Sequence, residues 1–392
     1  MNFAQKIRGN RAVAVLLTFL GLLVALWFLL SGVLGLITNE QDALHRTKTL
    51  AEGKRFVISI EPDQSYTHYE NNLVHLSGEL TTDETIIDPM FQMNVYALKL
   101  RRVVEMYQWQ ENQSQDEADN LEYTYQKVWL ESFIDSHKFK EPNRYHNPAM
   151  PLKSQLFIAK QVKLSHFILP SQLLEKMNHY QWLPMTDLSF WKAEDNLQSL
   201  LQDKPSHLKK GIYYVGQNPD FPKIGDLQIK FEIVQPETIS VIAKQVNSNL
   251  VPYQTQTGGN IELFEYGTVS ANKMFINARI SLFFNKLYER FIDFFMIFLG
   301  IYIIFNVLWI AKTSFPFMNK PSNIVGWLLS LIISAVLTLI IIGMTWKNYS
   351  PVIGITLLVI AVFSLYFLKF ARKSPKLSLI PETVVPQKMI ND

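Results

Sequence analysis

The sequence predicts a membrane protein with four transmembrane helices and one large, sheet-rich α+β domain outside the cytoplasm. Three observations predict this fold class: a long apolar run near the start of the chain, about 250 residues without a comparable run, and three apolar runs close together near the end. We expect an N-terminal cytoplasmic tail at 1–11 and an extracytoplasmic domain at 38–288. The expected transmembrane helices are 12–37, 294–311, 324–345 and 352–370, and a basic cytoplasmic tail follows at 371–392.

The first apolar run is predicted to be a retained anchor. Residues 12–37 carry no charge, and a helix of this length, rising 1.5 Å per residue, exceeds the hydrocarbon thickness of about 30 Å. A cleaved signal peptide has a shorter apolar stretch followed by small residues at the cleavage site, whereas this run leads into Thr38, Asn39 and Glu40.

The orientation follows from the positions of Lys and Arg. Cationic side chains are retained on the cytoplasmic side, and they are concentrated in residues 1–11, 371–392 and the loop after the second predicted helix. Both termini are therefore expected in the cytoplasm, and the large domain in the periplasm or lumen.

Composition excludes several classes of function. The chain has no cysteine, so disulfide scaffolds, thiolate metal sites and nucleophilic cysteines are absent. The net charge of +3 resides largely in the cytoplasmic flanks, so no nucleic-acid partner is expected. The expected partners are the lipid bilayer and either a second copy of the chain or other membrane proteins.

The outer domain is predicted to be sheet, helical insertion and sheet. Alternating β-branched and aromatic residues predict strands at 56–60, 73–80, 98–109, 226–234, 238–246 and 261–269. Helical periodicity predicts helices at 171–180 and 187–202. Gly258 and Gly259 predict a turn. The acidic stretch 111–122 is interpreted as a solvated hairpin loop, with a cation or partner contact as the alternative.

Four ordered blocks of this sequence resemble the LUMA family, also called transmembrane protein 43. They are LKLRRVVEMYQWQE at 98–111, the Tyr123, Tyr125 and Trp129 cluster with Phe139 and HNP at 146–148, NPDFPKIGDLQIKF at 218–231, and SVIAKQVNSNLVPYQTQTG at 240–258. The resemblance implies one N-terminal span, a large lumenal domain and three C-terminal spans.

The resemblance also implies a location and a type of function. Animal members are multispan proteins of the endoplasmic reticulum and inner nuclear membrane that oligomerise and bind partners, with no established catalysis. The lack of Cys and the richness in Lys, Asn and Ile favour a bacterial member, with a periplasmic domain and an inner-membrane location. A eukaryotic member would lie in the endoplasmic reticulum or nuclear envelope.

The chain shows no catalytic pattern. Its eight histidines include no H-E-x-x-H motif, and the two S-x-x-K matches lack the partner motifs of a serine acyltransferase. His137 and His146 can approach through a loop, but we interpret them as structural. We expect no cofactor, no metal and no enzyme activity.

The strongest charged block lies on one predicted strand. The block Lys99, Arg101, Arg102 and Glu105 lies beside Tyr107 and Trp109 in the sequence. On an extended strand Lys99, Arg101 and Glu105 share a face with Tyr107, and Arg102 lies on the other face. The block is predicted either to bind an anionic lipid headgroup or partner acid, or to form cross-strand ion pairs and arginine–aromatic stacks. We favour the structural interpretation.

A turn motif is predicted at residues 218–226. Pro219, Pro222 and Gly225 set turns after Asn218, and Asp226 caps a turn rather than acting as a base.

The predicted third span has one face of small and hydroxyl side chains. Gly326, Ser330, Ser334 and Thr338 recur every four residues, which allows another helix to approach closely, either within the protein's own bundle or in a dimer. Asn306, on the second span, is expected to bond a neighbouring span. No charged residue lies centrally in a span, which argues against an ion-coupled transporter.

Residues 274–293 alternate aromatic and charged positions in the pattern of an amphipathic helix, which either lies at the interface, continues into the span or forms a stalk. The whole sequence predicts a nonenzymatic scaffold, organiser or membrane-state sensor that acts through its outer domain. The alternatives are an envelope enzyme at the membrane surface and an accessory subunit of a transporter or channel.

Overall fold

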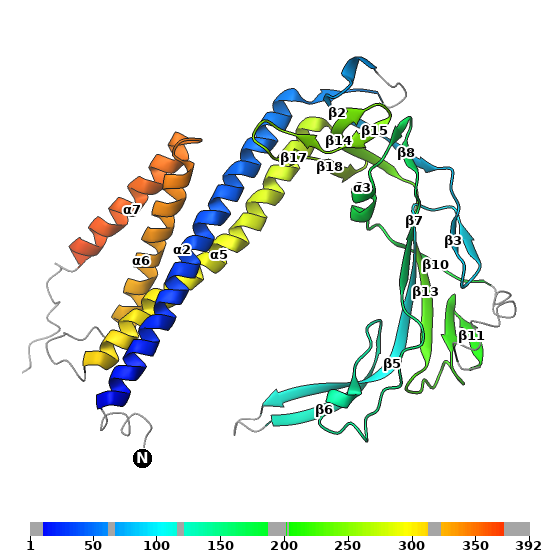
Figure 1. Ribbon diagram of the computed structural model, residues 1–392, viewed down its shortest axis with the longest axis horizontal. Helices are drawn as coiled ribbons and strands as arrows, with labels where there is room; N and C mark the ends of the chain where they lie inside the picture. The colour runs from blue at the N-terminus through cyan, green and yellow to red at the C-terminus, as the bar shows by residue number, and fades with distance from the viewer. Residues whose placement is uncertain are drawn as a thin grey trace, which may run out of the picture. The chain divides into compact units, whose positions relative to one another are not determined.

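The computed structural model describes residues 11–61, 67–115, 121–186, 201, 204–312 and 323–371 (Figure 1). The chain divides into two compact units. The helical unit contains Met1–Ala51 and Asn277–Asp392, and the sheet-rich unit contains Glu52–Ile276. The chain therefore enters the sheet-rich unit from one long helix and leaves it through another.

Four helices carry the apolar runs. They are α2 (Arg11–Phe56), α5 (Ala271–Lys312), α6 (Asn323–Trp346) and α7 (Pro351–Ala371). Three stretches in them are long and apolar enough to cross a membrane: Val15–Phe56, Ala271–Val307 and Gly326–Trp346. The described apolar part of α7, Pro351–Tyr366, is shorter. The fourth span therefore stays a prediction.

The first two helices are longer than the sequence predicted. α2 continues past residue 37 as far as Phe56, so the strand expected at 56–60 was wrong at its start, and only β1 (Ile58–Ser59) is extended. The physical reason is that no proline or glycine interrupts residues 38–52. The helix ends just after Gly53, whose carbonyl still accepts the N–H of Val57 at 2.9 Å.

The second helix settles the conformation of the predicted amphipathic segment. Residues 274–293 lie inside α5, which runs unbroken for 42 residues, so they continue into the apolar part as one helix. The sequence left this open because a helix at the interface and a helix continuing into the span have the same amphipathic pattern.

α2 and α5 approach closely where one helix has a glycine. A Cβ added at Gly300 would lie 2.7 Å from the backbone nitrogen of Leu29 and 2.9 Å from the carbonyl oxygen of Ala25. Neither main-chain atom can move without bending α2, so the contact requires glycine. The buried apolar residues beside this contact are Leu36, Ile297 and Ile301.

Glycines also allow close approach in the hairpin of α6 and α7. A Cβ at Gly354 would lie 2.5 Å from the Cα of Lys347, and one at Gly343 would lie 3.0 Å from the carbonyl oxygen of Gly354. These two glycines set the close crossing, and neither belongs to the small-residue face predicted on this helix.

The described part of the sheet-rich unit contains two seven-stranded sheets. The first consists of β1, β2 (Leu73–Thr82), β8 (Val162–Leu164), β9 (Phe167–Ile168), β15 (Asn249–Val251), β14 (Thr238–Val246) and β18 (Leu263–Tyr266). β2 and β14 are antiparallel and central, with Ile242 opposite His75. Because β2 also pairs with β8 and β14 with β15, the pairings of the first sheet close into a ring.

The second sheet is built around one long strand, β5 (Lys99–Gln115). Its order is β11 (Ser206–Lys209), β12 (Ile212–Val215), β13 (Leu227–Val234), β5 and β6 (Leu121–Leu130), with β10 (Gln181–Leu183) on β13 and β7 (Gln155–Ile158) on β5. Every second residue of β5 from Leu100 to Gln108 is buried, as strand alternation requires. The prediction of a central strand here is confirmed.

Short elements complete the described part of this unit. They are the hairpins β3 (Ile86–Asp88) with β4 (Met93–Val95) and β16 (Tyr253–Gln254) with β17 (Asn260–Ile261), the helix α3 (Ser171–Lys176), and the 3₁₀ turns η1 (Thr67–Tyr69) and η2 (Ser136–Lys138). The turn predicted at Gly258 is confirmed, and this residue has φ +86°. α3 is shorter than the helix predicted at 171–180, and the helix predicted at 187–202 lies outside the described residues except for residue 201.

The acidic stretch 111–122 is mostly strand, so the prediction of a loop there was wrong for residues 111–115 and 121–122. The ladder between β5 and β6 continues as far as Gln115 opposite Leu121, and the Tyr125 hydroxyl donates to Glu111 at 2.6 Å. Polar side chains on both faces made the strand look like a loop in the sequence. Residues 116–120 lie outside the described residues.

Candidate functional site: a buried polar network among the helices

The helical unit holds a buried carboxylate that bonds two other helices. Glu40 of α2 is only 1% exposed. It accepts hydrogen bonds from both Nε and Nη2 of Arg290 on α5, the latter at 2.9 Å. Trp346, at the end of α6, donates its indole Nε1–H to the same carboxylate at 2.6 Å. A bidentate arginine contact fixes both position and direction, so Glu40 joins three helices through one side chain.

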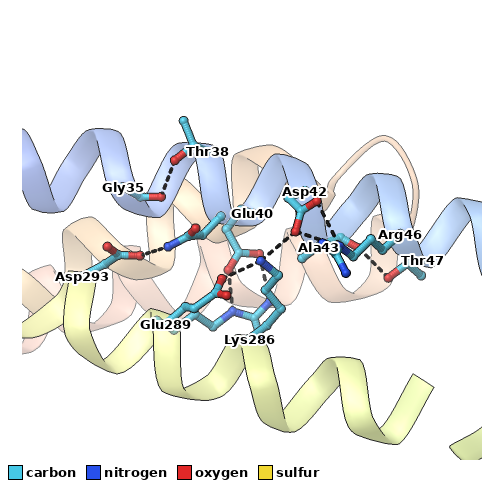
Figure 2. Close-up of polar contacts among 12 residues, drawn as sticks. Gly35, Thr38, Glu40, Asp42, Ala43, Arg46, Thr47, Lys286, Glu289 and Asp293 are labelled. Atoms are coloured by element: carbon cyan, nitrogen blue, oxygen red, sulfur yellow. Dashed lines mark hydrogen bonds and ion pairs between the residues drawn. The ribbon is translucent and has the colours of Figure 1, made fainter. Parts of the chain in front are cut away.

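A second contact joins α2 and α5 beside the first, between the residue before Glu40 on α2 and a residue one turn after Arg290 on α5. Asn39 Nδ2 donates to Asp293 Oδ2 at 2.6 Å. Asp293 lies against Gly35 (Figure 2), and a Cβ at Gly35 would lie 2.4 Å from Asp293 Oδ1. A Cβ at Gly32 would lie 2.8 Å from the Asp293 carbonyl oxygen. The two glycines therefore make room for the aspartate between the helices.

The outer part of the network is more exposed. Lys286 of α5 pairs with Asp42 Oδ2 at 2.8 Å and with Glu289 Oε2 at 2.5 Å. Asp42 also pairs with Arg46, one turn along α2, at 3.0 Å. Figure 2 shows these side chains continuing the row of contacts from Glu40 along the facing sides of α2 and α5.

The network balances charge closely. It contains the carboxylates of Glu40, Asp42, Glu289 and Asp293 and the cations Arg46, Lys286 and Arg290. Buried ions need partners or hydrogen bonds because their desolvation is costly. Glu40 and Lys286 have ion-pair partners here, and Asp293 has the hydrogen bond from Asn39. This arrangement holds helices in a fixed register.

The predicted charged block is occupied by contacts within the sheet-rich unit. Lys99 is 2% exposed and donates to the carbonyl oxygens of Glu175 and Met177 at 2.9 and 2.8 Å, at the end of α3. Burial lowers the pKa of the Lys99 ammonium. Arg102, equally buried, pairs with Asp88 at 2.5 Å.

The other members of the block lie on the face opposite Arg102, and they are more exposed than Lys99. Arg101 pairs with Glu131 at 2.9 Å, and Glu105 pairs with Lys230 at 2.6 Å. The neighbouring aromatic contacts are Tyr107 with Trp129, at 5.0 Å between ring centroids, and Trp109 with Tyr145, at 4.9 Å. These contacts are those of the structural interpretation, and a lipid or partner contact here stays a proposal.

The predicted turn motif forms a compact loop. Asn218 Oδ1 accepts the N–H of Asp220 at 2.8 Å, and Gly225 has φ +87°. Asp226 is buried and accepts the Lys223 N–H at 2.8 Å, the cap that the sequence predicted. Pro219 and Pro222 flank the loop, and the Pro219 carbonyl accepts from Lys209 at 3.3 Å.

Asp226 also makes a contact that the sequence did not predict. It accepts a hydrogen bond from the buried Tyr214 hydroxyl at 2.5 Å. Burial, together with this carboxylate, raises the pKa of Tyr214 well above its usual value. The tyrosine therefore stays protonated and acts as a fixed donor.

The small-residue face of α6 is largely buried, but its two serine hydroxyls bond their own helix. Ser330 Oγ donates to Gly326 O at 2.8 Å and Ser334 Oγ to Ser330 O at 2.6 Å. Thr338 Oγ1 is buried without a hydrogen-bond partner among the described residues. A Cβ at Gly326 would meet only Phe305 Cβ, at 4.0 Å, so this glycine does not set a close contact.

Asn306 likewise bonds its own helix. Its Nδ2 donates to the Tyr302 carbonyl, one turn earlier on α5, at 2.8 Å. A carbonyl four residues back is within reach of a helical side chain, which explains this local bond. The expected bond to a neighbouring span stays a prediction.

Sequence reasoning missed the residues that join the helices. Glu40 was treated only as the end of the first apolar run, and Arg290 only as one charge of an amphipathic helix. The signal available was a pair of opposite charges, each on the same predicted side of its apolar run. Nothing in the sequence near Trp346 indicates its hydrogen bond to Glu40, because the two residues are 306 positions apart.

No group of three or more metal-ligating side chains is found within residues 11–61, 67–115, 121–186, 201, 204–312 and 323–371. The rings of His137 and His146 do approach, with centroids 6.0 Å apart, as the sequence allowed. His137 bonds the exposed Asp135, a local contact at a 3₁₀ turn.

Comparison with known proteins places this chain. The family model described as transmembrane protein 43 matches residues 106–351. Human transmembrane protein 43 is 29% identical over 354 residues, covering 85% of this chain and 84% of the human protein. The Pongo abelii protein is 30% identical over 354 residues, covering 85% of this chain and 84% of that protein. The Drosophila melanogaster homolog is 28% identical over 340 residues, covering 82% of this chain and 86% of the fly protein. No solved structure matches the chain significantly.

Proposed function

Because this chain belongs to the transmembrane protein 43 family and is a membrane protein, we propose that it is a nonenzymatic membrane organiser whose outer domain responds to the arrangement of its helices. The proposal has two parts: the protein gathers a second copy or other membrane proteins, and the spacing of its helices reports the state of the bilayer.

One observation carries the proposal. α2 and α5 each run unbroken from an apolar segment to the sheet-rich unit, and Glu40, Arg290 and Trp346 join them to α6. A change in the spacing of the apolar segments cannot be absorbed by a flexible linker, because neither helix has one. A protein built this way couples helix spacing in the membrane to its large domain.

The proposed orientation follows the charges of the flanks. Lys and Arg are concentrated outside the apolar runs at the N-terminal and C-terminal ends, so both termini lie in the cytoplasm and the sheet-rich unit on the other side of the membrane. In a bacterium this side is the periplasm.

Crosslinking in the native membrane tests the organiser. Full-length protein with an affinity tag is crosslinked in intact membranes, solubilised and recovered, and coexpression with a differently tagged copy detects self-association. We expect assemblies that contain a second copy or another membrane protein. Recovery solely as a partnerless monomer contradicts the proposal.

Bilayers of different thickness test the response. Full-length protein is reconstituted into bilayers of short and long acyl chains, and amide hydrogen exchange is measured in residues 36–46 and 286–300. We expect exchange in both segments to change with thickness, because mismatch tilts the helices that the network joins. Equal exchange in all bilayers contradicts a sensing role.

A further inference from the structure

A cavity of about 370 Å³ lies in the helical unit, next to the polar network. Side chains from α2, α5, α6 and α7 all line it. Ligand pockets in proteins typically occupy about 300 to 1,000 Å³, so the cavity is large enough for part of a small amphiphile. Its apolar wall consists of Leu282, Phe283, Ile342, Trp346, Ile353 and Leu357.

The polar part of the wall is cationic. Arg279, Lys286 and Arg290 line the cavity, and no carboxylate does. Lys286 and Arg290 are neutralised from behind by the carboxylates of the network. Arg279 is exposed and makes no hydrogen bond or ion pair with the part of the chain that the structure describes. The wall therefore has one cation available to an anionic group.

The cavity is continuous with an apolar face of α5. Phe283 lines the cavity and is also 54% exposed. Phe284, Leu287 and Phe291 continue the exposed face along the helix. Such a large exposed apolar face indicates contact with lipid or with a partner. In a membrane protein it places hydrocarbon beside the entrance to the cavity.

We propose that the cavity binds one anionic phospholipid from the surrounding bilayer. The phosphate pairs with Arg279, since a guanidinium forms bidentate bonds with phosphate oxygens. One acyl chain enters between Leu282, Ile342 and Leu357, and the other lies on the exposed face beginning at Phe283. This two-chain arrangement selects a phospholipid over a free fatty acid, which has no second chain for the outer face.

Native mass spectrometry of the full-length protein in detergent tests this proposal. The protein is titrated with phosphatidylglycerol, phosphatidylcholine and oleic acid, and the fraction with one bound molecule is measured. Both phospholipids carry the phosphate, but the cationic wall of the cavity repels the choline ammonium of phosphatidylcholine. We expect phosphatidylglycerol to bind about tenfold more tightly than phosphatidylcholine, a difference of about 1.4 kcal/mol. Oleic acid should bind more weakly than phosphatidylglycerol.

Three variants separate the contributions. Arg279→Gln removes the available cation and should abolish the preference for phosphatidylglycerol. Leu357→Trp fills the apolar part and should reduce binding of both phospholipids severalfold. Lys273→Gln, a matched loss of one exposed charge on the same helix that does not line the cavity, should bind as the unaltered protein does.

Four results would overturn the proposal. Equal affinity for the two phospholipids would show that the cavity does not recognise an anionic headgroup. The same loss in Lys273→Gln as in Arg279→Gln would show only general charge attraction. Oleic acid binding more tightly than phosphatidylglycerol would identify the occupant as a fatty acid. Because Arg279 is exposed and unpaired among the described residues, its substitution should leave the thermal midpoint unchanged, and a large drop would show a structural role instead.

Discussion

The two units each contain an arginine that bonds a buried carboxylate, and the two pairs do different things. In the sheet-rich unit Arg102 bonds Asp88, 14 residues earlier, and its guanidinium lies 5.1 Å from the centroid of the Phe91 ring. In the helical unit Arg290 bonds Glu40 across 250 residues, and Trp346 adds a third helix to the same carboxylate. One pair stabilises a neighbourhood of strands, and the other sets the arrangement of helices.

The difference teaches how to interpret a buried ion. The carboxylate is fully buried in both places, so burial of the carboxylate alone does not distinguish a local support from a long-range connection. The number of residues between the two partners in the sequence does distinguish them. Substitutions in the two pairs should therefore lower stability by similar amounts, but the regions in which amide exchange rises should differ in extent.

The largest effect is expected from Glu40→Ala. It leaves the Arg290 guanidinium and the Trp346 N–H without their acceptor, and removing one partner of a buried pair costs about 3 to 5 kcal/mol. We expect a lower thermal midpoint for the full-length protein in detergent. Amide exchange should rise in α2, α5 and α6 together.

Asp42→Ala is the matched control for Glu40→Ala. Asp42 is on the same helix two residues later, its side chain is 40% exposed, and Lys286 keeps Glu289 as a partner. An exposed pair contributes about 0 to 1 kcal/mol, so this variant should unfold close to the unaltered protein. Equal losses in the two variants would show that the network acts only through its net charge.

Arg102→Met should cost a similar amount but act locally. The substitution leaves the Asp88 carboxylate buried without its cation, at about 3 kcal/mol or more. We expect exchange to rise in β3, β5 and β7 and to stay unchanged in the helical unit. Adding Asp88→Asn should restore most of the stability, because no buried charge remains and the Met90 N–H keeps its acceptor. No recovery in the double variant would mean that Arg102 contributes mainly through packing.

A smaller effect is expected where glycine allows helices to touch. Gly300→Ala places a methyl group against main-chain atoms of α2, and overpacking of this kind costs about 1 to 3 kcal/mol. Gly326→Ala is the control, since its nearest new contact would be at 4.0 Å. The thermal midpoint should fall in the first variant and stay level or rise in the second. A larger fall in the thermal midpoint for Gly326→Ala than for Gly300→Ala would mean that the predicted small-residue face makes the closer helix contact.

The sequence predicted the elements better than their partners. Strand β14 was predicted with its observed bounds, because its apolar and β-branched composition is a local property. The glycines of α2 and α5 and the Glu40 network were missed, since each depends on what lies across a helix contact more than 200 residues away in the chain. The extension of α2 was missed because the apolar run ends before the helix does.

The smallest effect is a dependence on pH within the sheet-rich unit, from Lys99. Its folded pKa lies below the ordinary value of 10.5, so the unfolded chain holds more protons than the folded one between those two values. Stability from this group therefore rises with pH across that interval and is constant outside it. A neutral amine still has two N–H donors, one for each of its two carbonyl acceptors, so deprotonation breaks neither bond.

Lys99→Met isolates this contribution against other alkaline titrations. The raised pKa of Tyr214 acts in the opposite direction, because an unfolded tyrosine loses its proton first, and it is present in both proteins. The difference in urea unfolding free energy between the full-length protein and the variant should therefore grow as pH rises toward 10.5. A difference that stays level up to pH 10.5 and shrinks above it would mean that the two carbonyls favour the charged ammonium more than burial opposes it. The hydrogen bonds of Lys99 would then offset its desolvation as fully as the partners of Glu40 offset the desolvation of that carboxylate.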